Sequence, residues 1–219
     1  MLHPISTHLL DNKTDMHTNY TKITTNVYTF NTVTMNVVNI HKSVLYNQAM
    51  EKKHDGKNIE AIELFKQYLL TDNIDDNIDD SMNKKYDIYI NIALLSSDYD
   101  EIVSYYEKAM NLCPDRSEPY FYFGVYCNQH HNFEQAYELL TIAKNMQYDV
   151  VKYKYPDVKE SAYGVYAIDE LTVSCYWLKK YDEGMQYLTQ IINMPYFKHN
   201  ETRLTQNLQF FIDALASTG

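Results

Sequence analysis

Apolar residues recur every three or four positions from about residue 41 to the end of the chain, which is the spacing of one buried face of an α-helix. Short polar clusters interrupt this pattern at 54–56, 96–98 and 130–132. Such clusters are typical of turns between helices. The pattern therefore predicts a series of helices joined by short turns. It ends in the segment 201–216, whose apolar residues again follow a helical period and predict a final amphipathic helix.

The first 40 residues do not share this helical pattern. They are dense in Thr and Asn, above all between Thr18 and Thr34, and these residue types favour turns or extended backbone over helix. We expect residues 1–40 to form a Thr/Asn-rich leader that is disordered or partly extended, and residues 41–219 to form one helical domain.

One stretch of sequence recurs along the helical region. The segment beginning at Asp98 aligns with the segment beginning at Asn132, 34 residues further on, and the same frame recurs from Lys57 and from Lys180. Where two helices cross closely a small residue is needed, and one turn later a large apolar residue fills the groove. The small positions are Ala61, Ala136 and Gly184, with Ile102 as the exception. The large positions are Phe65, Tyr106, Leu140 and Leu188.

A helix–turn–helix unit of 34 residues resembles the tetratricopeptide repeat. The resemblance implies an all-α solenoid of about four repeats with a C-terminal capping helix. In this frame Cys127 and Cys175 share one position and are expected in the core. The extra residues at 72–80 and at about 148–163 are expected to form surface loops between repeats.

The region from 115 to 211 carries five landmarks in order, at 116–120 (Arg-Ser-Glu-Pro-Tyr), 132–137, 166–171, 175–184 and 203–211. In this respect it resembles the helical-repeat module that follows the catalytic domain in a class of sugar-nucleotide-dependent glycosyltransferases. The resemblance implies an association with glycan synthesis. The α/β catalytic domain of those enzymes has no counterpart in the sequence, so we expect a chain that is not itself an enzyme.

Composition narrows both the fold class and the class of partner. Only five Gly and five Pro occur in 219 residues, which argues against a turn-rich β fold. The 19 basic and 29 acidic residues give a net charge of −10, and such a field repels nucleic acid and acidic membrane surfaces. The sequence also lacks a signal-peptide pattern and any Cys spacing typical of disulfides or zinc. We therefore expect a cytoplasmic protein with a protein partner and no cofactor.

Three motifs could carry metal chemistry, and each has a simpler interpretation. Asp98-Tyr-Asp100 could hold a divalent cation, but acidic residues at a turn are typical of a helix start. The acidic run 72–80 could bind Ca²⁺ weakly, but it lacks the Gly and distal Glu of an EF-hand. Adjacent His130 and His131 point in different directions and suit a polar turn. No catalytic or metal residue is assigned, and a cryptic metal or hydrolase activity is the weakest hypothesis.

The main candidate is a binding surface. First helices of such arrays line a concave groove, and their outward positions contact ligands. Aromatic rings beside amides and carboxylates can stack on and hydrogen-bond a peptide or a sugar. The alternative is that the aromatic residues only pack on neighbouring helices. The groove residues selected by the frame are Tyr46, Asn91, Phe121, Asn128, Gln129, Tyr166, Asp169, Tyr176 and Trp177.

The two arginines of the sequence both fall in the landmarks above. We expect a charge network that ties the third repeat to the capping helix. Its members would be Arg116, Glu118, Asp169, Glu170 and Arg203.

Two functions stay open at this point. The first is a scaffold without catalytic activity that binds a partner protein through its concave face. The second is a detached repeat subunit of a glycosyltransferase system, acting in glycan biosynthesis with a glycosyltransferase as its partner.

Overall fold

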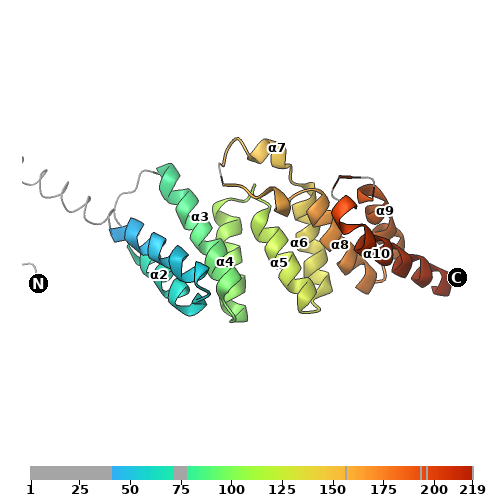
Figure 1. Cartoon of the computed structure of the whole chain (residues 1–219), viewed down its shortest axis with the longest axis horizontal. Helices are drawn as coiled ribbons and strands as arrows, with labels where there is room; N and C mark the ends of the chain where they lie inside the picture. The colour runs from blue at the N-terminus through green and yellow to red at the C-terminus, as the bar shows by residue number, and fades with distance from the viewer. Residues whose placement is uncertain (1–40, 72–77, 156, 193, 196, 219) are drawn as a thin grey trace, which may run out of the picture.

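The computed structural model describes residues 41–71, 78–155, 157–192, 194–195 and 197–218 (Figure 1). The leader expected over residues 1–40 lies outside the described residues. Most of the acidic run, residues 72–77, lies outside them as well, while 78–80 form the start of a helix.

The described residues form antiparallel helix pairs that lie side by side in one elongated array (Figure 1). The first two pairs are a helix over 41–54 with α2 (Asn58–Leu70), and α3 (Ile78–Leu95) with α4 (Tyr99–Leu112). The next two are α5 (Glu118–Gln129) with α6 (Phe133–Asn145), and α8 (Val165–Trp177) with α9 (Tyr181–Ile191). The last helix, α10 (Phe197–Thr218), packs on α9. This confirms the prediction of an all-α repeat array with four helix pairs and a C-terminal helix.

Three of the turns within pairs share one backbone geometry. Gly56, His131 and Lys179 each have a positive φ, between 59° and 72°. In each turn the following backbone N–H donates to the carbonyl five residues earlier, at 2.9 Å. This is the hydrogen bond that satisfies the last carbonyls of a helix when the chain reverses. The turn in the second pair differs, because Asp98 caps α4 by accepting from the Glu101 N–H at 2.8 Å. The helix-start interpretation of Asp98-Tyr-Asp100 is therefore confirmed.

The small residues of the repeat frame lie where helices cross. Ala61 and Ala136 are fully buried. At Gly184 an added Cβ would overlap the ring of Phe211 on α10 and lie 3.0 Å from the Cβ of Cys175, so only glycine allows this approach. Cys127 and Cys175 are buried as predicted, and burial raises the pKa of their thiols to about 11 and about 12.

Residues 148–163 lie between two repeats, and many of them are exposed, as predicted, but the insertion is not only a surface loop. This insertion contains α7 (Tyr148–Val151) and a 3-10 turn, η2 (Glu160–Ala162). Its Ala162 and Tyr163 are buried against the third helix pair. The Ser117 N–H donates to the Tyr163 hydroxyl at 2.9 Å, and the Ser117 hydroxyl donates to the Ala162 carbonyl at 2.6 Å. In Figure 1 the insertion with α7 lies at one edge, opposite the turns that join α3 to α4 and α5 to α6.

Candidate functional site

The groove residues of the first two repeats, Tyr46 and Asn91, are both hydrogen-bonded to Asp87 on α3. The Tyr46 hydroxyl donates to the Asp87 carboxylate at 2.7 Å. The Asn91 side-chain amide donates to the same carboxylate at 2.9 Å, and its oxygen accepts from the Lys53 ammonium. Asn91 is only 2% exposed. These groups therefore link the helix over 41–54 to α3, and they saturate one another with hydrogen bonds.

Later repeats are linked in the same way. Asn128 on α5 donates to the Glu170 carbonyl at 2.9 Å and accepts from the Ser174 hydroxyl at 2.7 Å. Asp169 on α8 pairs with both terminal nitrogens of Arg203 on α10, one of them at 3.0 Å. Asn128 and Asp169 are buried. Together with Asn91, they lie between helices and not on an open surface, because a neighbouring helix contacts their polar groups.

The other predicted groove residues keep more contact with solvent. Phe121, Tyr166 and Tyr176 are half-buried, while Gln129 and Trp177 are exposed. Gln129 ends α5 and Trp177 ends α8. The two most accessible residues of the set therefore occupy equivalent places, at the turn side of the array. The binding role assigned to the nine residues stays a prediction.

The five residues expected to form one charge network lie in two groups. Arg203 and Asp169 join α10 to α8, and Glu170 lies beside them. Burial, and then the Asp169 carboxylate, raise the pKa of Glu170. The second group surrounds Arg116 and joins α5 to the insertion. The repeat alignment does not include the insertion, so it could not predict this contact.

Arg116 and Glu118 form the most deeply buried ion pair that we describe. Their side chains are each 2% exposed, and the Arg116 Nη2 to Glu118 Oε1 distance is 2.8 Å. Arg116 also binds Asp157 of the insertion at 3.0 Å, and its guanidinium carbon lies 3.9 Å from the centre of the Tyr86 ring. Glu118 accepts from the Lys159 N–H at 2.9 Å and from the Tyr163 hydroxyl at 3.0 Å. The arrangement fastens the insertion to the start of α5.

A row of aromatic side chains in contact with one another lies at the turn side of the array. Phe133 stacks on Trp177 with ring centres 5.3 Å apart and planes 11° from parallel. Trp177 contacts Tyr176 edge-on at 5.7 Å, and Tyr176 contacts Phe210 of α10 at 6.1 Å. Trp177 is 58% exposed and Phe210 is 55% exposed. We call these four residues, Phe133, Tyr176, Trp177 and Phe210, the aromatic edge.

Acidic groups border this edge. The first turn of α6 carries Glu134, next to Phe133, and the first turn of α9 carries Asp182 and Glu183. Glu134 and Asp182 are exposed, and neither forms an ion pair with another residue of the described part of the chain. Acidic residues are favoured there because the helix N-terminus is the positive end of the helix dipole. The combination presents exposed rings beside negative charge.

Sequence reasoning found Tyr176 and Trp177 but missed Phe133 and Phe210. A signal for Phe133 was present, because Tyr99, Phe133 and Tyr181 all occupy the first position of a second helix. The position of Phe210 could not be read from the repeat, since it depends on how α10 lies against α8.

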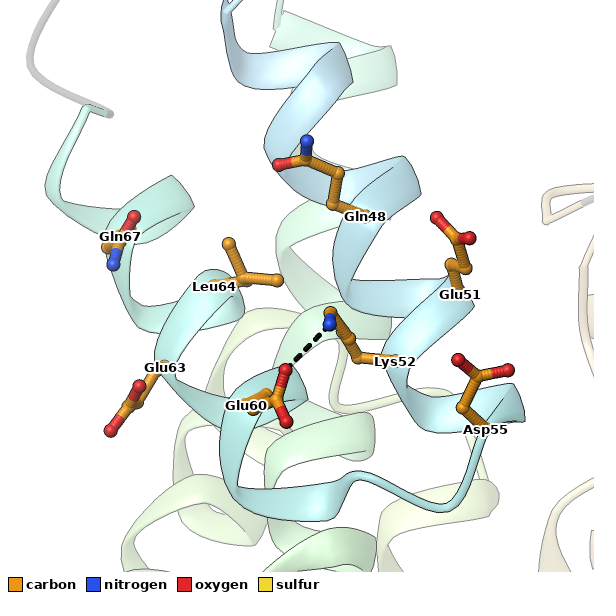
Figure 2. Close-up of a pocket in the computed structure, with 8 residues that line it drawn as sticks. All are labelled: Gln48, Glu51, Lys52, Asp55, Glu60, Glu63, Leu64 and Gln67. Carbon is orange, nitrogen blue, oxygen red and sulfur yellow. Dashed lines mark ion pairs between the residues drawn. The ribbon is translucent and has the colours of Figure 1, made fainter.

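A hollow of about 390 Å³ lies elsewhere, on the first helix pair (Figure 2). It is lined by Gln48, Glu51, Lys52, Asp55, Glu60, Glu63, Leu64 and Gln67. Lys52 pairs with Glu60 at 2.6 Å across the two helices, which raises the pKa of the lysine. In Figure 2 the carboxylates of Glu51 and Asp55 lie on one side and that of Glu63 on the other, so they do not converge on one point.

Within the described ranges, no three His, Cys, Asp or Glu side chains are grouped as a metal site would require. None of the helices among these residues is both long enough and apolar enough to cross a membrane.

Comparison with known proteins identifies the fold. No family model matches the chain, and no curated protein matches it. Solved structures of MamA, a TPR-repeat protein, do match. A MamA structure from AMB-1 has a TM-score of 0.55 at 14% identity, covering 81% of this chain and 84% of that chain. A MamA double mutant from RS-1 has a TM-score of 0.52 at 14% identity, covering 81% and 96%.

The chain has the tetratricopeptide-like helical-repeat fold. At this identity the likeness shows the fold alone. The expected relation to glycosyltransferases gains no support from these matches and stays a prediction.

Proposed function

We propose that this protein is a scaffold without catalytic activity that binds a partner protein through the turn side of its helix array. The fold supports a protein-binding role, because arrays of this kind present an extended surface to which every repeat contributes. The observation that carries the proposal is the aromatic edge, where Trp177 and Phe210 stay more than half exposed and belong to one run of ring contacts with Tyr176 and Phe133.

The location of the proposed binding surface follows from the contacts that the other predicted groove residues make between helices. Asn91, Asn128 and Asp169 are engaged between helices, so binding a partner through them would first break contacts that hold the repeats together. Gln129 and Trp177 can be contacted without such a loss. Exposed Trp and Tyr are also the residue types that contribute most to protein interfaces.

Site-specific photo-crosslinking tests this proposal. A photoreactive phenylalanine analogue is placed at Gln129, and in a matched control at Tyr153, which is 86% exposed on the insertion at the opposite edge. We expect discrete crosslinked products in native lysate from position 129 and none of the same mass from position 153. Equal products from both positions, or none from position 129, would contradict the proposal.

A further inference from the structure

The aromatic edge carries information on the chemistry of the partner. Phe133 and Trp177 are stacked on each other nearly in parallel, so one face of the Trp177 indole is covered while 58% of the residue stays exposed. An indole face is the strongest aromatic acceptor for a cation, at up to about 6 Å from the ring centre. The edge therefore offers both apolar contact and a site for positive charge.

Negative charge is in excess around the aromatic edge. Glu134 and Asp182 are exposed at the starts of α6 and α9, and the whole chain carries a net charge of −10. Of the nearby cations, Lys180 lies 3.9 Å from Glu183, while Lys179 is exposed in the turn. A purely apolar partner would strip water from these carboxylates without pairing them, and an anionic partner would be repelled.

The protein already binds one of its own lysines in this way. The Lys180 ammonium lies 3.7 Å from the centre of the Tyr137 ring. The Tyr137 hydroxyl donates to Glu183 at 2.8 Å, and the same Glu183 attracts Lys180. One ring and one carboxylate thus hold an ammonium group between α6 and α9, next to the aromatic edge.

We propose that the aromatic edge binds a basic segment of the partner protein, with Lys or Arg side chains over the open face of Trp177 and paired with Glu134 and Asp182. This inference rests on the proposed function and specifies the charge of the partner. It predicts binding that is weakened by salt, because exposed ion pairs are screened by mobile ions.

The test uses the purified full chain and a defined probe. Trp177 is the single tryptophan of the sequence, so its intrinsic fluorescence reports on the edge directly. A 12-residue peptide of alternating Arg and Gly is titrated, with a peptide of alternating Glu and Gly as the matched probe. We expect a saturable change in Trp177 emission with the Arg peptide, lost at high salt, and no saturable change with the Glu peptide.

A double variant, Glu134→Gln with Asp182→Asn, keeps the rings and removes the two charges. Its affinity for the Arg peptide should fall about fivefold to tenfold, which is the effect of removing two exposed ion pairs. Tyr153→Ala, at the opposite edge, should leave the affinity unchanged. Circular dichroism and urea unfolding establish that both variants keep the wild-type fold.

Three results would overturn the inference: no response to the Arg peptide, an equal response to both peptides, or an unchanged affinity in the double variant. These results are distinguishable from failure of the proposed function. If crosslinking from position 129 succeeds while the Arg peptide does not bind, the scaffold role stands and the partner segment is not basic.

Discussion

The buried pair of Arg116 and Glu118 allows a sharp test of how the insertion is held. We consider the substitution Arg116→Met, which keeps the apolar stem and removes the guanidinium. Glu118 would then stay buried, with its side chain 2% exposed, and would lose the guanidinium that pairs with it at 2.8 Å. Asp157 would lose its bond to the same group at 3.0 Å.

Removing one partner of a buried ion pair costs about 3–5 kcal/mol, because the remaining charge stays out of water. Glu118 keeps the Lys159 N–H and the Tyr163 hydroxyl as donors. We therefore expect the lower end, a loss of about 3 kcal/mol in the free energy of unfolding. Urea unfolding followed by circular dichroism measures it.

The second arm of the experiment adds Glu118→Gln to Arg116→Met. The amide is neutral, its oxygen can accept from the Lys159 N–H, and its NH2 can donate to the Tyr163 hydroxyl, so the double variant should be more stable than Arg116→Met alone. Hydrogen exchange should show the added mobility of Arg116→Met concentrated in residues 148–163. The reasoning would be refuted if Arg116→Met cost less than about 1 kcal/mol, or if the second substitution destabilised the protein further.

Two further predictions concern the C-terminal half of the array. Gly184→Ala places a Cβ against Phe211 and Cys175 and should lower the free energy of unfolding by about 1–3 kcal/mol, with faster hydrogen exchange in α10; wild-type stability would contradict this. Glu170→Gln should raise the melting temperature at pH 7 but not at pH 4. Burial and Asp169 raise the pKa of Glu170 in the folded state, so its ionisation opposes folding above its ordinary pKa near 4.5 and has no effect below it. An equal effect at both pH values would show that charge is not the cause.

The repeat architecture could be predicted because it depends on residues close in sequence. Ala61, Ala136 and Gly184 mark helix crossings by their small size, and their spacing repeats whatever the rest of the molecule does. The burial of Cys127 and Cys175 followed from the same frame.

The polar contacts between repeats could not be predicted in this way. The frame places Asn91 and Asn128 on outward positions of their own helices, but it does not say which side chain of the next repeat meets them. In the structure Lys53 of the preceding repeat meets Asn91 and Ser174 of the following repeat meets Asn128, and the amides become buried. The insertion presents the same difficulty, because Asp157 belongs to no repeat and reaches Arg116 only through the fold.

The central claim is that the aromatic edge is the binding surface of this scaffold. Quantitative affinity capture from native lysate tests it most directly, with the wild-type chain beside Trp177→Ser and Tyr153→Ser, which exchange exposed aromatic residues at opposite edges. We expect wild type and Tyr153→Ser to capture the same set of proteins, and one or more of these proteins to be lost with Trp177→Ser. Capture that is unchanged by Trp177→Ser, or reduced equally by both substitutions, would contradict it.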